Sequence, residues 1–133
     1  SGAVVNVSSS STYKPLPLLS VYRASKAALT ALTESVSLEL AEVGIRARVV
    51  VPGMAPSTAF ASHAQGRIME AGGFPQPYAD FAQRTLSEMQ RAGEGPVTTA
   101  QDVAEAVYRA ATDPDCPLTL PAGADAVAWS RAA

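Results

Sequence analysis

The chain has 133 residues, with 10 basic and 12 acidic side chains and a formal net charge of −2. Hydrophobic residues make up 47% and charged residues 17%, a balance that favours a folded domain over a disordered chain. The absence of a Lys/Arg cluster predicts no nucleic-acid partner, because phosphates require clustered cations. The only cysteine, Cys116, excludes an internal disulfide.

No apolar stretch approaches the roughly 20 residues that a membrane-spanning helix needs. No basic segment precedes an apolar one in the manner of a signal peptide. We therefore expect no membrane partner and a cytoplasmic location.

The first half of the chain predicts a strand, a helix and a second strand. The β-branched run from Ala3 to Val7 leads into four serines, which is typical of a buried strand that opens into a loop. Residues 21–43 lack Gly and Pro and predict a helix, with Ser20 as its N-cap and Gly44 as its stop. Residues 45–51 predict the second strand, so the two strands should be parallel with a right-handed crossover.

The predicted 21–43 helix carries two stripes of apolar residues. The bulky stripe, which we expect to be buried, consists of Leu29, Leu32, Val36, Leu40 and Val43. The other stripe is small, at Ala24, Ala28 and Ala31, and suits close contact with a neighbouring helix.

The second half is punctuated by glycines and prolines. Residues 54–97 predict two short helices, at about 61–71 and 78–92, within a segment whose length is typical of a binding lid. A capping-box pattern at Thr99 and Asp102 predicts a helix to about Thr112. Residues 118–120 predict a third short strand.

Tyr22 and Lys26 lie four residues apart, on one face of the predicted helix. A nearby ammonium stabilises a phenolate, so this pair is suited to general acid/base work. Ser9 follows the first strand, and Pro52-Gly53 follows the second. Because ligands bind outside the C-terminal ends of parallel strands, we expect these residues to meet at one sheet edge.

The motifs Asn6-Val7-Ser8-Ser9, Tyr22-Arg23-Ala24-Ser25-Lys26, Gly44-Ile45-Arg46-Ala47 and Val51-Pro52-Gly53 resemble the short-chain dehydrogenases/reductases in order and spacing. The resemblance implies the C-terminal part of an α/β, Rossmann-like doubly wound parallel sheet. It treats residues 1–133 as one partial domain, a fragment of about half the family's domain, with residues 54–97 as the lid.

The resemblance also implies roles for individual residues. Tyr22 exchanges a proton with the substrate oxygen, Lys26 assists it and holds the nicotinamide ribose, and Ser9 orients the substrate. Pro52, Gly53 and Thr58 would bind NAD or NADP together with Tyr22 and Lys26. The implied partners are a small alcohol or carbonyl substrate and a second copy of the chain, packed through the 21–43 helix.

Two departures from the family pattern keep alternatives open. Ser57 stands where the family threonine is usual, one residue before Thr58, and Ser8, Ser10 or Ser11 could replace Ser9 if the register shifted. No Gly-x-x-x-Gly-x-Gly follows a strand within these 133 residues, so the pyrophosphate-binding loop is missing from them. The main hypothesis is an NAD(P)-dependent oxidoreductase, and the alternative is an inactive, truncated chain that acts as an interaction module.

Overall fold

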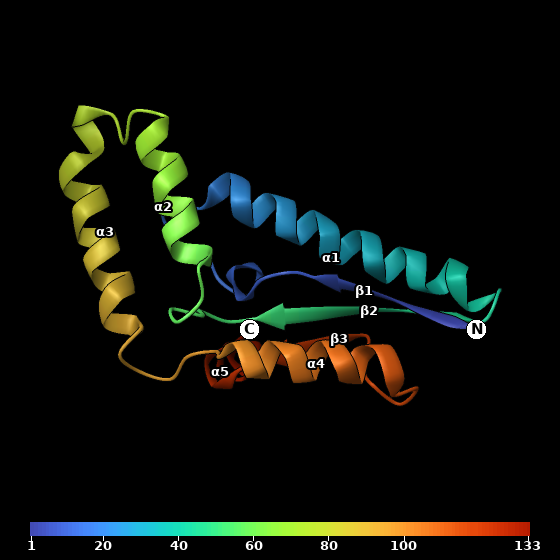
Figure 1. Cartoon of the computed structure of the whole chain (residues 1–133). Coiled ribbons are helices and arrows are strands. Elements are labelled where there is room, and N and C mark those ends of the chain that lie inside the picture. Colours follow the sequence, from blue (N-terminus) through green and yellow to red (C-terminus); the bar gives the residue numbers. More distant parts are fainter.

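The computed structural model describes all residues, 1–133, as an α/β fold built on one parallel sheet. Its strands are β1 (Gly2–Val7), β2 (Ile45–Pro52) and β3 (Thr119–Ala122), in the order β1-β2-β3. α1 (Ser20–Ala41) lies on one side of the sheet and α4 (Ala100–Thr112) on the other (Figure 1). The predicted strand–helix–strand unit with parallel strands is therefore confirmed.

The residues that begin and end α1 differ in part from those predicted. Gly44 adopts a φ of 74°, a left-handed conformation that favours glycine and reverses the chain into β2. The predicted N-cap is wrong: Ser20 is the first helical residue, and Leu19 precedes it with no capping side-chain bond. The helix ends at Ala41, two residues before the predicted end.

Polar side chains form part of the contact between α1 and the sheet. Thr33 is the only fully buried residue of the helix, and its Oγ1 accepts a 2.9 Å hydrogen bond from Asn6 Nδ2. The Ser8 and Thr30 hydroxyls lie 2.8 Å apart in the same seam. The prediction of a buried bulky stripe is wrong in part, because the side chains of Leu32 and Val43 are 57% and 66% exposed.

The core is centred on β2, whose Val49, Val50 and Val51 are fully buried between the two layers. From α4, Ala106 and Ala110 pack against it. The predicted capping box is confirmed, since the Thr99 hydroxyl and the Asp102 carboxylate each accept the other residue's backbone N–H. Small residues on α4 thus let the helix approach the central strand closely.

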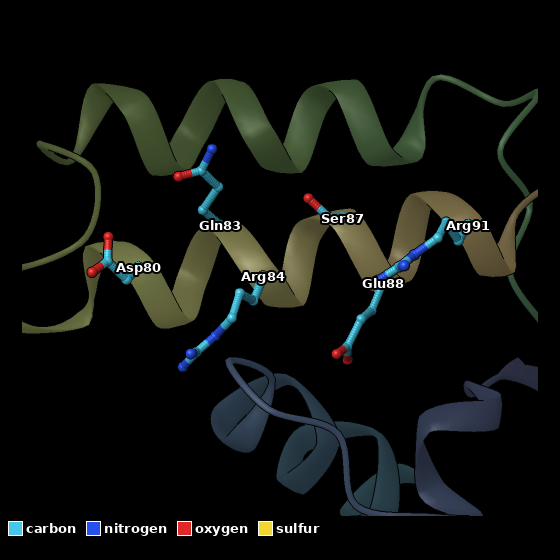
Figure 2. Close-up of a pocket in the computed structure, with 6 residues that line it drawn as sticks. All are labelled: Asp80, Gln83, Arg84, Ser87, Glu88 and Arg91. Carbon is cyan, nitrogen blue, oxygen red and sulfur yellow. The ribbon is translucent and has the colours of Figure 1, made fainter.

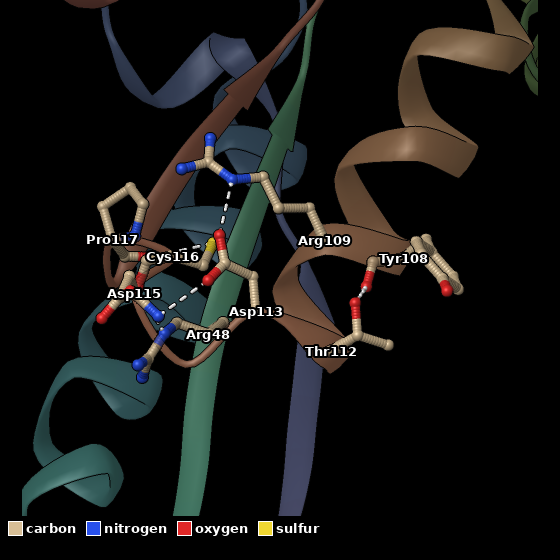
Figure 3. A network of polar contacts seen from close by, with 8 residues as sticks. All are labelled: Arg48, Tyr108, Arg109, Thr112, Asp113, Asp115, Cys116 and Pro117. Atoms are coloured by element: carbon tan, nitrogen blue, oxygen red, sulfur yellow. Dashed lines mark hydrogen bonds and ion pairs between the residues drawn. The ribbon is translucent and has the colours of Figure 1, made fainter.

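A hydrogen-bonded turn joins α4 to β3 (Figure 3). Asp113 accepts hydrogen bonds from the Asp115 backbone N–H at 2.9 Å and from Arg109 Nε at 3.2 Å. These partners hold the pKa of the Asp113 carboxyl below its usual value, the backbone bond first. Arg48 Nε of β2 donates to the Cys116 carbonyl at 2.9 Å, so the turn is tied to the sheet. β3 begins at Thr119, one residue after the predicted start, and extends to Ala122.

Two helices form a hairpin that projects from the C-terminal edge of the sheet (Figure 1). They are α2 (Phe60–Glu70) and α3 (Ala79–Ala92), joined through the short η2 (Gln76–Tyr78). Their bounds agree with prediction to within one residue. Only Ala82 and Thr85 of this hairpin are fully buried.

The last element, α5 (Ala124–Ala132), was not predicted as a helix. It starts directly after Gly123, which has a φ of 100° and provides no capping side chain. No helix of the structure combines the length and the apolarity needed to cross a membrane.

Candidate active site at the C-terminal edge of the sheet

The serine loop leaves β1 and forms the short helix η1 (Ser10–Thr12), with Ser9 as its N-cap. Ser8, Ser10 and Ser11 are buried, whereas Ser9 is partly exposed. Ser9 Oγ accepts from the Ser11 N–H at 3.2 Å and from the Ser11 hydroxyl at 3.0 Å. Its own hydroxyl hydrogen has no partner in the chain and can donate to a ligand oxygen.

Arg23, which sequence reasoning left without a role, fastens this loop to α1. Its Nε donates to the Ser11 carbonyl at 2.7 Å and its Nη2 to the Thr12 carbonyl at 3.3 Å. The motif residue next to Tyr22 therefore fixes the backbone that carries Ser9.

Lys26 lies where the first turns of α1 cross the end of β1. Its Nζ donates to the Val7 carbonyl at 3.0 Å, which leaves two N–H groups for other acceptors. The same nitrogen is 5.9 Å from the centre of the Tyr22 ring. The structure thus holds a cation beside the phenol at the end of the serine strand.

Tyr22 is partly buried, and its hydroxyl makes no hydrogen bond within the chain. The Phe60 ring at the start of α2 lies 6.0 Å from the Tyr22 ring, centre to centre, tilted by 54°. This contact places an aromatic wall from the helical hairpin beside the phenol. Sequence reasoning did not single out Phe60.

Pro52 ends β2, and the loop that follows it reaches the same edge as Ser9 and Lys26. The parallel register pairs Val7 with Val50, and the Ser8 N–H donates to the Val50 carbonyl at 2.8 Å. Thr58 is partly buried and its hydroxyl donates to the Ala55 carbonyl at 2.8 Å. The alternative residue, Ser57, is exposed and its hydroxyl has no partner.

The serine loop also rests on α5. Lys14 Nζ lies 4.0 Å from the centre of the Trp129 ring, a cation–π contact between the two elements. Next to it, burial raises the pKa of the Tyr13 phenol. Trp129 is therefore a packing anchor for the loop that carries Ser9.

The surface of α3 forms two open hollows. The larger, ≈ 550 Å³, is lined only by polar and charged residues of α3 (Figure 2): Asp80, Gln83, Arg84, Ser87, Glu88 and Arg91. In Figure 2, Gln83 points toward α2, whereas Arg84 and Glu88 point to the other side, where the blue ribbon of the N-terminal part passes. A smaller hollow, ≈ 330 Å³, includes Phe74 and Leu86.

Two other potentially reactive side chains lie outside this edge. His63 is exposed on α2, and Cys116 is buried in the core. No three His, Cys, Asp or Glu side chains gather as metal ligands would. The Tyr22 phenol, the Lys26 ammonium and the Ser9 hydroxyl keep polar hydrogens free for a ligand at the edge.

These donors fit one end of a dinucleotide. The two free N–H groups of Lys26 suit ribose hydroxyls, and the Ser9 hydroxyl suits a carbonyl oxygen. The 133 residues contain no glycine-rich turn for the pyrophosphate, so the fit concerns the nicotinamide end alone.

Comparison with known proteins gives a consistent result. The model of the short chain dehydrogenase family matches residues 1–67. An uncharacterized oxidoreductase of Schizosaccharomyces pombe is 28% identical over 128 residues, 96% of this chain and 51% of that protein. A human mitochondrial dehydrogenase/reductase, SDR family member 2, is 51% identical over 53 residues, 40% of this chain and 19% of that protein.

Among solved structures, a short-chain dehydrogenase from Streptomyces avermitilis superposes with a TM-score of 0.69 at 27% identity. That match covers 99% of this chain and 45% of the Streptomyces chain. The chain belongs to the short-chain dehydrogenase family, and it spans about half or less of the length of these relatives. Their names place them among dehydrogenases and oxidoreductases.

Proposed function

We propose that this chain contributes the proton-transfer half of an NAD(P)-dependent oxidoreductase that interconverts an alcohol and a carbonyl. The observation that carries the proposal is the position of Lys26 Nζ, which is bonded to the end of β1 and lies beside the Tyr22 ring. The free hydroxyl hydrogen of Ser9 supports it from the neighbouring loop.

In this mechanism, the nicotinamide supplies or accepts the hydride when the cofactor is bound. Tyr22 Oη donates its proton to the substrate oxygen during reduction and takes it back during oxidation. The Lys26 ammonium stabilises the phenolate that results and offers its remaining N–H groups to the ribose hydroxyls. The Ser9 hydroxyl donates to the carbonyl oxygen, where negative charge develops.

The other parts of the proposal concern partners and location. Residues 54–97, with Phe60 beside Tyr22, serve as the lid over a small alcohol or carbonyl substrate. The exposed small residues of α1 suit close packing against a second copy of the chain. The protein acts in the cytoplasm without nucleic acid or a membrane as partner.

Titration and turnover test the proposal. The test uses a protein in which residues 1–133 are joined to a pyrophosphate-binding half. It is titrated with NADH and NADPH by fluorescence, and oxidation of the bound cofactor is followed with a panel of aldehydes and ketones. Replacing Tyr22 with Phe should lower turnover by roughly 10²–10⁴-fold and change the cofactor Kd little. Tyr108→Phe, on an exposed part of α4, is the matched control and should retain full turnover.

Absence of NAD(P)H binding by the protein that carries both halves, or full turnover by its Tyr22→Phe variant, would show the proposal to be wrong.

A second candidate is supported by the free edge of the sheet. β1 pairs with β2 on one side only, and its Val4 and Val7 side chains are 41% and 39% exposed. An open edge with apolar side chains invites association, as expected of an inactive chain that acts as an interaction module. A monomer with a cooperative melt in analytical ultracentrifugation and calorimetry would argue against this candidate.

A further inference from the structure

The backbone just after β2 is hydrogen-bonded to residues from the far end of the chain. The Gly53 N–H donates to Thr98 Oγ1 at 2.9 Å and to the Ala122 carbonyl at 3.2 Å. The Met54 N–H donates to Asp125 Oδ2 at 2.7 Å, and the Met54 carbonyl accepts from the Thr98 N–H at 2.8 Å. Three backbone groups of two consecutive residues are thus fixed.

Thr98 and Asp125 also hold each other. Thr98 is completely buried, and its Oγ1 lies 2.7 Å from Asp125 Oδ1 and 2.9 Å from the Ala122 carbonyl. Because a hydroxyl has one hydrogen, Thr98 shares it between these two acceptors. Asp125 stands in the first turn of α5, where the N-terminal end of the helix dipole favours a carboxylate.

Two glycines make room for this network. A Cβ on Gly53 would overlap the Asp125 carboxylate, and a Cβ on Gly123 would overlap the Thr98 side chain. The backbone of the loop therefore lies directly against the polar side chains, with no side chain of its own between them. Such a contact leaves the loop little freedom to move.

We propose that Thr98 and Asp125 are positioning residues that preset the loop of residues 52–58 for the nicotinamide end of the cofactor. This inference rests on the function proposed above. A loop that is already ordered before the cofactor binds loses less conformational entropy on binding, so less of the interaction free energy is offset. Neither side chain is hydrogen-bonded to Ser9, Tyr22 or Lys26, so both act through the backbone of Gly53 and Met54.

Two variants and one control separate this role from a general effect on stability. Asp125→Asn keeps the shape of the side chain and loses its charge, and Thr98→Val removes the hydroxyl alone. Asp113→Asn is the control, because Asp113 is also a carboxylate that accepts a backbone N–H at 2.9 Å. Asp113 lies between α4 and the start of β3, whereas the loop follows the paired ends of β2 and β3.

The variants are compared by two measurements, hydrogen exchange of the loop and ligand binding, and the first does not depend on the cofactor. Hydrogen exchange followed by mass spectrometry reports the protection of a peptide spanning residues 52–58. Binding is measured in parallel, in the protein that carries both halves, for NAD(P)H and for ADP-ribose or its 2′-phosphate, which lack the nicotinamide. Asp125→Asn and Thr98→Val should speed exchange in this peptide and weaken NAD(P)H binding by roughly tenfold, the effect of losing one good interaction, while the ADP-ribose Kd changes less than about twofold.

Each other outcome has a definite meaning. Unchanged exchange in both variants overturns the positioning role itself. Faster exchange with equal weakening of NAD(P)H and ADP-ribose binding overturns the link to the nicotinamide. The link is also overturned if the Asp113→Asn control shows the pattern expected of the two variants. A wild type that binds neither NADH nor NADPH refutes the proposed function, while the exchange measurement still decides whether Thr98 and Asp125 fix the loop.

Discussion

Gly123 is the position where a single added methyl group should be most harmful. Its φ of 100° and ψ of 154° lie in a region that is open to glycine and costs other residues about 1–3 kcal/mol. A Cβ there would also lie 2.8 Å from Thr98 Cα, a backbone atom that cannot turn away. Overpacking of this kind costs about 1–3 kcal/mol.

Together these two effects predict that Gly123→Ala lowers the free energy of unfolding by about 4 kcal/mol. For a chain of this size, that corresponds to a fall in Tm of more than about 10 °C. Calorimetry or circular dichroism of the purified protein measures it, and a variant that is unfolded at room temperature agrees with the prediction.

Gly66→Ala is the matched control for this substitution. Gly66 lies within α2, and a Cβ there would meet no atom within 4 Å. Alanine is the better helix former by about 0.5–1 kcal/mol, so the control should melt at or slightly above the wild-type temperature. If Gly123→Ala melted within 1 °C of the wild type, the argument from backbone conformation and overlap would be refuted.

Three further predictions follow from single contacts. Arg23→Ala removes two hydrogen bonds to the serine loop and should speed protease cleavage within residues 9–17. Thr99→Ala removes the helix cap of α4 and should lower the free energy of unfolding by about 1 kcal/mol, measured by urea unfolding. The pKa of Asp113 is held below its ordinary 3.8. Its contribution to stability is therefore fully present above pH 3.8 and is lost as the pH falls from there through the lower pKa of the folded state. Asp113→Asn should therefore reduce the loss of stability on acidification below about pH 4.

Each of these predictions has a result that contradicts it. Arg67→Ala on exposed α2, whose guanidinium bonds nothing in the chain, should leave cleavage of the serine loop unchanged, and equal cleavage in both variants would remove the special role of Arg23. A Thr99→Ala midpoint equal to that of the wild type would mean that the capping box is not stabilising. Parallel acid curves for Asp113→Asn and wild type would mean that the Asp113 carboxylate adds no pH-dependent stability.

Local sequence signals predicted the parts of the fold that depend on neighbouring residues. The capping box at Thr99 and Asp102 and the reversal at Gly44 each act within a few residues, and both were found as expected. The order of strand, helix and strand followed from the same kind of signal. α5 was missed because Gly123 starts it without a capping side chain.

Long-range contacts account for what the sequence could not predict. Periodicity indicated a bulky face on α1, but Thr33 and Thr30 meet the sheet through Asn6 and Ser8. Gly53 bonds Thr98, which lies 45 residues further along the sequence, and no local sequence pattern connects the two. The positions of Ser9, Tyr22 and Lys26 were inferred from spacing and resemblance, whereas the bonds that hold them in place could only come from the three-dimensional arrangement.

The position of α5 has a practical consequence for how the protein is handled. This helix is the last element of the chain, yet it supports the serine loop through Trp129 and the loop after β2 through Asp125. Deletion of residues 124–132 would therefore remove the support of both loops at once, although Ser9, Tyr22 and Lys26 themselves stay in the chain. A fragment shortened there would lose the order of the candidate site before it lost any residue of that site.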